Sequence, residues 1–161
     1  MTIEDTITAI LKAEGGDKVT NNSLDSAGKT QFGVSQKWNP EAWEDGKVTE
    51  AEARDIYYRT YVQWPKFDLI TDPNLQAQLV DYGVNSGPYI AIQKLQSILG
   101  TDTDGVIGPR TLELLETADM KMLNNQLVAA RIRMIAKIVK KSPSQAVFIV
   151  GWCERALSFL R

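Results

Sequence analysis

The sequence predicts a mostly α-helical domain of about seven or eight helices, with one small β-hairpin or β-lobe directly after the first helix. Three observations support this fold class. Apolar residues recur at helical spacing in several segments that begin at capping residues or prolines. One stretch, residues 17–35, instead holds turn formers between short β-capable pieces. No repeat, low-complexity tract or linker divides the 161 residues, so we expect a single domain over 1–161.

Short-range signals mark the first helix and the β segment after it. Thr2 begins a capping box, and an apolar stripe continues from there to Glu14. The glycine pair 15–16 ends this helix because glycine readily leaves the helical conformation. We expect the hairpin to pair the β-capable pieces 19–20 and 30–34.

The remaining helices can be located by their first residues. Thr49 and Glu52 form a second capping box, which opens a helix that runs to about Gln63. The later helices share a proline or a polar capping residue at the start, and we expect them to begin at Pro73, Pro88, Pro109, about residue 119 and Ser142.

Composition excludes several classes of function. Eighteen basic and 20 acidic residues give a net charge of −2, so there is no basic excess of the kind that nucleic-acid binders show. The single Cys153 cannot form an intramolecular disulfide. The chain has no histidine, which excludes Ser-His-Asp and Cys-His catalysis and leaves no plausible zinc site.

The acidic positions 102, 104 and 113 resemble a calcium loop, but Ile107 stands where such a loop needs glycine. We therefore expect no metal and no cofactor, and chemistry that rests on carboxylates, hydroxyls, amides or lysine.

The N-terminal segment is acidic where a signal peptide would be basic, and no run approaches ~20 apolar residues. We expect no export signal and no insertion into a membrane.

Glu14 is the candidate acid catalyst. It closes an amphipathic helix, where the helix dipole presents partial negative charge and disfavours a carboxylate. Partial burial would add to that effect, and a carboxyl that stays protonated near neutral pH can protonate a leaving oxygen. The two glycines that follow leave room for a bulky substrate. The position of Glu14 by itself also fits the alternative that it is a solvent-exposed residue at an ordinary helix end.

Two further residues could face Glu14 across a groove, because the hairpin follows the helix directly. Asp25 is either a general base, a nucleophile or an Asx-turn residue in a glycine-rich loop. Thr30 either orients a water molecule or stands in a strand for its β-propensity.

Four groups of motifs, which cover nearly the whole chain, carry a resemblance to a known family. They are E-G-G at 14–16 with D-x-x-G-x-T-x-F-G-V-S at 25–35, D-Y-G-V-N-S-G at 81–87, I-Q-x-L-Q at 92–96 with D-G-V-I-G-P at 104–109, and the closing helices with Arg133 and residues 144–152. Together they resemble the glycoside hydrolase 108 family of N-acetylmuramidases, found among phage endolysins and bacterial wall-lytic proteins.

The resemblance implies a lysozyme-like fold, with a catalytic-motif half at 1–87 and a peptidoglycan-binding-like half at 88–161 in the same domain. It implies hydrolysis of the β-1,4 bond from N-acetylmuramic acid to N-acetylglucosamine, with Glu14 as general acid and bacterial peptidoglycan as partner. As an endolysin the chain would be a monomer that accumulates in the host cytoplasm and reaches the wall through a separate pore, the holin. Two alternatives stay open: a non-catalytic peptidoglycan-binding module that uses 88–116, and a lytic transglycosylase.

The sequence departs from the family pattern at two places. Asp17 stands where an aromatic residue commonly follows E-G-G, so the screening of Glu14 from water is in question. A Tyr-Trp pair is usual near the end of the second main helix, whereas here Val62 follows Tyr61 and the indole comes at Trp64. The lining of the sugar groove therefore stays open.

The candidate substrate-binding residues each have a structural alternative. Asn85 and Ser86 either hydrogen-bond acetamido groups of the glycan or end a helix before Pro88. Tyr58 and Tyr61 either stack on sugar rings or belong to the core, which is the commoner place for such a cluster. The lysines at 137, 140 and 141 are interpreted as a solvated helix face, in preference to a contact with an anionic wall polymer.

Overall fold

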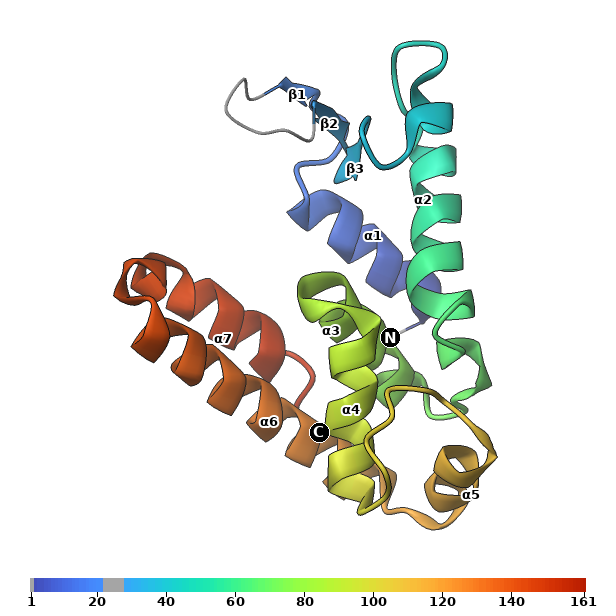
Figure 1. The fold of residues 1–161 in the computed structure, drawn as a ribbon, viewed down its shortest axis with the longest axis vertical. Coiled ribbons are helices and arrows are strands. Elements are labelled where there is room, and N and C mark those ends of the chain that lie inside the picture. Colours follow the sequence, from blue (N-terminus) through green and yellow to red (C-terminus); the bar gives the residue numbers. More distant parts are fainter. Residues whose placement is uncertain (1, 22–27) are drawn as a thin grey trace.

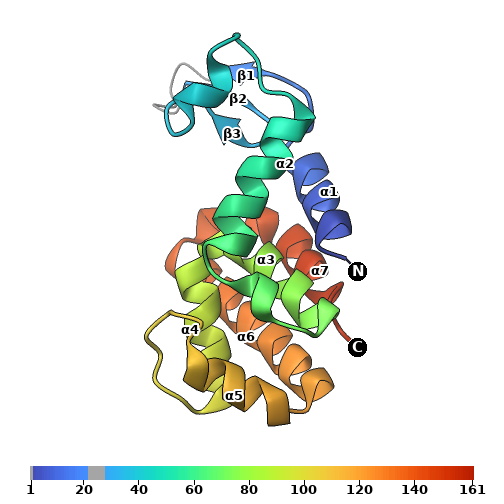
Figure 2. The ribbon, with the colours of Figure 1, turned by 90° about the vertical axis from the view of Figure 1, so that its right-hand side faces the viewer.

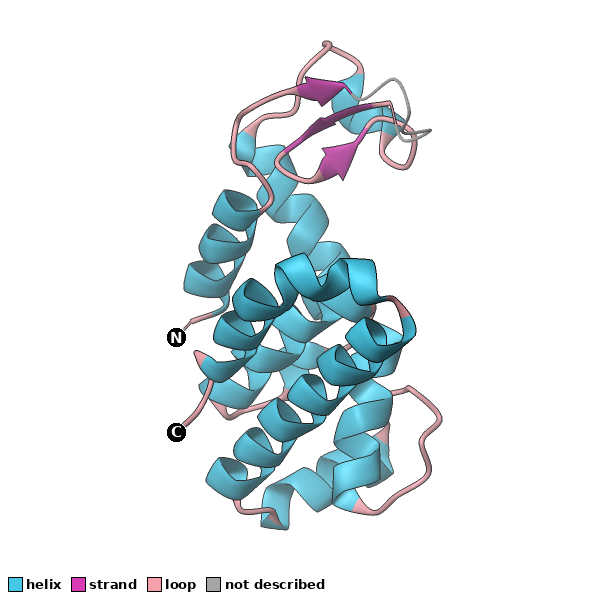
Figure 3. Cartoon of the chain, turned by 90° about the vertical axis from the view of Figure 1, so that its left-hand side faces the viewer, coloured by secondary structure: helices cyan, strands magenta, loops and turns pink. Residues whose placement is uncertain are grey.

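The computed structural model of the chain describes residues 2–21 and 28–161. These residues form seven α-helices and a small antiparallel sheet that follows the first helix (Figure 1, Figure 3). The α-helices are α1 (Ile3–Ala13), α2 (Glu50–Tyr58), α3 (Pro73–Ser86), α4 (Pro88–Leu99), α5 (Pro109–Thr117), α6 (Met120–Lys141) and α7 (Ile149–Leu157). The strands are β1 (Thr20–Asn21), β2 (Lys29–Gln31) and β3 (Val34–Ser35). The predicted mostly α fold with a β-lobe after the first helix is confirmed.

The sheet and α5 lie toward opposite ends of the long axis of the molecule (Figure 1, Figure 2). The strand order is β1-β2-β3, with Thr20 opposite Thr30 and Gln31 opposite Val34. Helix α2 runs from the sheet end into the helical body, and α6 and α7 pack against each other as an antiparallel pair (Figure 1).

Helix α3 lies at the centre of the core. Its residues Leu75, Leu79 and Tyr82 are fully buried, and the helix packs against α1, α4 and α6. One continuous apolar cluster extends from Ile7 of α1 to Leu127 of α6. The core therefore includes side chains from both halves of the chain, and burial of this apolar surface is the main force that orients the helices.

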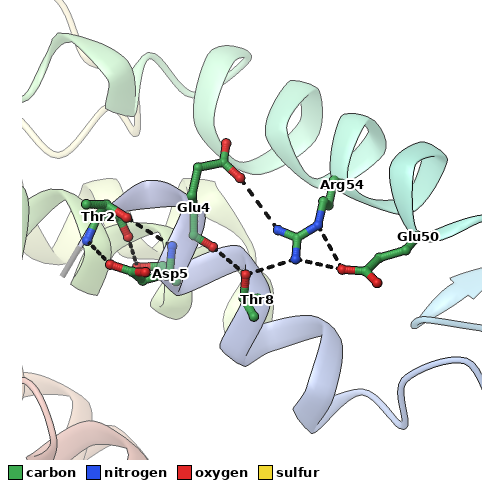
Figure 4. A network of polar contacts seen from close by, with 7 residues as sticks. Thr2, Glu4, Asp5, Thr8, Glu50 and Arg54 are labelled. Carbon is green, nitrogen blue, oxygen red and sulfur yellow. Dashed lines mark hydrogen bonds and ion pairs between the residues drawn. The ribbon is translucent and has the colours of Figure 1, made fainter.

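Polar contacts on the surface join α1 to α2. Figure 4 shows Arg54 of α2 between two carboxylates and a hydroxyl. Its guanidinium donates to Glu50 at 2.7 Å and to Thr8 of α1 at 2.9 Å, and it lies 3.5 Å from the carboxylate of Glu4. Exposed ion pairs contribute little stability, about 0–1 kcal/mol each. The consequence of this network is a fixed orientation of the two helices that carry the candidate site.

A buried ion cluster joins α3 to the last two helices. Asp81 of α3 accepts a hydrogen bond from Arg131 of α6 at 2.6 Å and from Arg155 of α7 at 2.7 Å. The Asp81 and Arg131 side chains are almost fully buried, at 6% and 5% exposure. A charge at that depth is tolerated because its partners are close and directional.

A polar contact also fixes the loop between α4 and α5. Gln96, which is buried, donates to Asp104 at 2.7 Å and to the Val106 carbonyl at 2.9 Å. Its side-chain oxygen accepts from the Gly105 amide at 2.9 Å. Gln96 thus supplies the hydrogen bonds that these loop groups would otherwise make to water.

One predicted helix changes its geometry before its expected end, and one predicted helix start is wrong. The helix expected to reach Gln63 leaves α geometry after Tyr58 and continues as a π-helical turn over Arg59–Gln63, closed by the Trp64 amide on the Arg59 carbonyl at 2.9 Å. The last helix begins at Ile149, because the Ser142 side chain makes no capping hydrogen bond and Pro143–Phe148 forms a 3-10 helix instead.

No helix in the described part of the chain is long and apolar enough to cross a membrane.

Candidate active site

Glu14 stands at the end of α1, as the sequence predicts. It is the C-terminal cap of the helix, and its amide donates to the Ile10 carbonyl at 2.9 Å. Gly15 and Gly16 follow with φ of 99° and 60°, which only glycine adopts without strain. A side chain at either glycine would meet nothing within 4 Å, so the space beside Glu14 is open. Glu14 itself is exposed, and the partial burial considered from the sequence is therefore not present in this structure.

The turn between β2 and β3 brings Gly33 directly against Glu14. A Cβ at Gly33 would lie 3.0 Å from Glu14 Cβ and 3.2 Å from its Cγ, and it would overlap the hydroxyl of Tyr57. Gly33 also has a φ of 74°, in the left-handed region. The backbone at this position therefore forms one wall of the Glu14 side chain, and only a residue without a side chain fits.

Gln31 of β2 holds this turn in place. Its side-chain nitrogen donates to the Asp17 carbonyl at 2.8 Å, and its side-chain oxygen accepts from the Val48 amide at 2.8 Å. Next to it, the Phe32 amide donates to the Gly16 carbonyl at 2.9 Å. These bonds tie the sheet to the chain that leaves α1. The motif at 25–35 leaves this position unspecified, and the sequence assigns Gln31 no role.

Tyr57 and Tyr61 lie beside Glu14 on one face of α2 and its π-helical extension. Their ring centroids are 5.5 Å apart with the ring planes at 33°. Burial raises the pKa of Tyr57, and the Glu14 carboxylate raises it further. The same two causes raise the pKa of Tyr61. Both phenols therefore remain protonated at neutral pH and can donate hydrogen bonds.

The aromatic cluster is thus divided between core and site. Tyr57 is buried and borders Glu14, Tyr61 is half-buried, and Tyr58 is exposed. Successive helical residues point about 100° apart, so Tyr58 lies on a different face of α2 from Tyr57. Trp64, at 72% exposure, lies outside the core. By sequence Tyr57 belongs to the same aromatic cluster as Tyr61. Its position beside Glu14 could not be predicted, because that depends on how α1 packs against α2.

Of the two candidate partners of Glu14, Asp25 lies outside the described residues. Thr30 lies in the middle of β2, half-buried, and its carbonyl accepts a hydrogen bond of 3.4 Å from the Thr20 hydroxyl. Alternation along a strand directs the Thr30 side chain to the face opposite Gln31. Its role in orienting water stays a prediction.

Asn85 and Ser86 line a pocket of about 120 Å³ at the end of α3, together with Trp152 and Arg155 of α7. The Asn85 amide donates to the Asp81 carbonyl at 2.7 Å, which orients the side chain. Arg155 also lines a second cavity, of about 180 Å³, with Ala13 of α1, and its charge lowers the pKa of Tyr57, opposite to the effect of Glu14.

The described part of the chain contains no group of three or more His, Cys, Asp or Glu that could hold a metal ion. The described residues at this site include one exposed carboxyl and two protonated phenols, and the amide of Asn85 lies in the separate pocket at the end of α3. This set can protonate a leaving group and hydrogen-bond a polar substrate.

Comparisons with known proteins give two family matches and a similar solved structure. Residues 7–87 match the family model described as glycosyl hydrolase 108, and residues 90–157 match a model described as a predicted peptidoglycan domain. The solved structure of SagA from Brucella abortus is similar, with 27% identity over 98% of this chain and 95% of that chain, and a TM-score of 0.68. No curated protein matches the chain.

Proposed function

We propose that this chain, which belongs to the glycosyl hydrolase 108 family, cleaves peptidoglycan. The bond cleaved in this proposal is the β-1,4 bond from N-acetylmuramic acid to N-acetylglucosamine. The chain is a glycosyl hydrolase with a predicted peptidoglycan domain after its catalytic part. The observation that carries the proposal is the environment of Glu14, inside the matched 7–87. Its carboxyl is exposed to a substrate on one side and bordered by Gly33 and the protonated Tyr57 on the other.

In the proposed reaction Glu14 donates its proton to the glycosidic oxygen as the bond between that oxygen and the anomeric carbon breaks. A water molecule then forms the new bond to the anomeric carbon and gives up its proton. Two routes for the water stay open. In an inverting reaction Asp25 is the base that accepts this proton, with Thr30 orienting the water. In a retaining reaction Asp25 is the nucleophile that first bonds to the anomeric carbon; the water then breaks that bond, and the Glu14 carboxylate accepts the proton. The anomer released first, observed by NMR, distinguishes them.

The remaining candidates act in substrate binding in this proposal. Asn85 and Ser86 hydrogen-bond acetamido groups from their pocket at the end of α3, and the half-buried Tyr61 offers part of its ring to a sugar. Tyr58 is exposed on the neighbouring face and contacts a more distant sugar of the strand.

We propose further that the chain acts as an endolysin monomer, held in the host cytoplasm until a holin opens the membrane to it. The support for this is the resemblance of its motifs to those of phage endolysins. Expression in a bacterium with and without a co-produced pore-forming protein tests it, because lysis should require the pore.

The test of the catalytic proposal compares Glu14→Gln with the unmodified chain on purified peptidoglycan. Loss of the acid should lower the rate by about 10²–10⁴-fold, the usual contribution of a general acid. Glu44→Gln, at another exposed glutamate of the catalytic part, is the matched control and should keep full activity.

Mass spectrometry of the sugar ends identifies the reaction. Reducing muramic acid ends are expected. Anhydro-muramic ends would instead establish a lytic transglycosylase, and binding without any cleavage would establish a non-catalytic module. Full activity in a well-folded Glu14→Gln chain would overturn the assignment of the acid.

A further inference from the structure

Charge is distributed unevenly over this protein. Helices α4 and α6 together carry seven lysines and arginines and no aspartate or glutamate. The whole chain has 18 basic and 20 acidic residues, so the other 11 basic residues share the rest of the chain with all 20 acidic ones. A chain with net charge −2 thus concentrates positive charge on two adjacent helices.

The two helices enclose a groove. Helices α4 and α6 lie side by side in the lower part of the molecule (Figure 1, Figure 2). The groove between them has a volume of about 520 Å³, and its charged lining residues are Lys94, Arg133 and Lys137. Arg133 and Lys137 are four residues apart on α6, so both project from one face of that helix.

These three cations have no ionic partner within the described residues. All three are exposed, and the ion pairs of the described chain involve other side chains. Arg131, the one buried cation of α6, is paired with Asp81. The groove therefore presents three positive charges to a ligand without an internal acid to neutralise them.

The floor of the groove is apolar. Ile98 of α4 and Ala130 and Met134 of α6 are half-buried within it. The Met134 sulfur accepts a hydrogen bond of 3.3 Å from the hydroxyl of the buried Tyr82. A ligand that fits this surface carries several anionic groups along a backbone with small apolar side chains.

We infer that this groove binds the stem peptide of peptidoglycan. The stem peptide carries free carboxylates and alanine methyl groups, which match the cationic edge and the apolar floor. The glycan strand offers no free negative charge to three cations, because the lactyl carboxyls of its muramic acids are amide-linked to that peptide. The groove residues lie inside the match to a predicted peptidoglycan domain, and none of them belongs to the Glu14 site. The inference rests on the proposed function in one respect, that peptidoglycan is the partner. It adds the place of recognition and the part of the wall recognised.

Cosedimentation with purified sacculi tests the inference. All variants carry Glu14→Gln, which prevents cleavage if Glu14 is the acid. The release of reducing ends is measured in every sample, so that residual cleavage, which would contradict the catalytic proposal, is distinguished from weak binding. The groove variant is Lys94→Gln/Arg133→Gln/Lys137→Gln. The control is Lys121→Gln/Lys140→Gln/Lys141→Gln, which removes the same charge from exposed positions of α6 outside the groove. Thermal unfolding checks that both variants are folded.

The groove variant should bind about tenfold more weakly than the parent, as three exposed charge contacts predict, and the control less than threefold more weakly. Raising the salt should weaken the parent and remove the difference. Stem peptides released from sacculi by an amidase should compete with intact sacculi for the parent chain and should not affect the groove variant, and extraction of wall phosphopolymers should change nothing. Equal losses in the groove and control variants, or no competition by the released peptides, would overturn the inference. Loss of binding on phosphopolymer extraction would assign the groove to a phosphate polymer instead.

Discussion

Replacement of Gly33 by alanine tests whether the backbone of the β-lobe positions Glu14. The new Cβ would overlap the Tyr57 hydroxyl and lie 3.0 Å from Glu14 Cβ, so at least one of these groups has to move. Two costs add. A left-handed φ of 74° costs alanine about 1–2 kcal/mol. Forcing a methyl group into a close-packed site costs a further ~1–3 kcal/mol.

Gly46→Ala is the matched control for strain. Gly46 has a φ of 86°, but a Cβ there would meet nothing within 4 Å. It should therefore lose about 1–2 kcal/mol from φ alone. The difference between the two variants, about 1–3 kcal/mol, measures the contact with Tyr57 and Glu14.

Activity should separate the variants more clearly than stability. Displacement of a catalytic group by about 1 Å can cost ~10²-fold in rate, so Gly33→Ala should clear a wall suspension about 10²-fold more slowly. Gly46→Ala should clear it at the parent rate. Urea unfolding and turbidity loss are the two assays.

A double variant shows whether the new methyl group at position 33 clashes with the Tyr57 hydroxyl or with Glu14. Adding Tyr57→Phe to Gly33→Ala removes the hydroxyl that the new methyl group would overlap, and it should restore part of the lost stability relative to Tyr57→Phe alone. If Gly33→Ala loses no more stability and activity than Gly46→Ala, the loss is strain only, and the reasoning that places Gly33 as a wall of the site is refuted.

Three further predictions concern the framework. Asp81→Asn leaves Arg131 and Arg155 without their shared carboxylate and should lower the free energy of unfolding by about 3–5 kcal/mol in urea titrations. Gln96→Leu leaves the Gly105 amide and the Val106 carbonyl without their partner, so it should cost about 2–3 kcal/mol and speed proteolysis of the loop 101–108. Partial burial raises the pKa of Asp72, but the Leu75 amide and Arg161 outweigh it and hold this pKa below its usual value. Asp72→Ala should therefore cost about 1 kcal/mol at pH 7, and the difference should disappear as the pH falls through the lowered pKa, measured by thermal unfolding.

Much of the fold could be predicted from sequence because helix starts are local events. The capping boxes at Thr2 and Thr49 close hydrogen bonds within three residues, and both are present in the structure. Pro73, Pro88 and Pro109 open α3, α4 and α5 for the equally local reason that proline already holds a helical φ. The position of Glu14 at the end of α1 follows from the glycines next to it.

Where the local sequence signals were weak, the observed helices differ from the predicted ones. Ser142 and Pro143 form a plausible helix start, yet they open a 3-10 helix. The turn at Arg59–Gln63 has the composition of an ordinary helix and adopts π geometry. Propensity differences between these helix types are small, so the packing of neighbouring elements decides between them.

The sequence by itself determined the class of fold, the carboxylate that could act as an acid and the chemistry that a chain without histidine cannot use. Only the tertiary structure decided what surrounds that carboxylate. Gly33 and Tyr57 meet Glu14 because α1, α2 and the sheet pack together, and Asp81 reaches Arg131 and Arg155 across 50 and 74 residues of chain. Such contacts leave no local pattern in a sequence. A capping bond depends on residues three positions apart, whereas these contacts depend on burial of the shared core, which orients every helix at once.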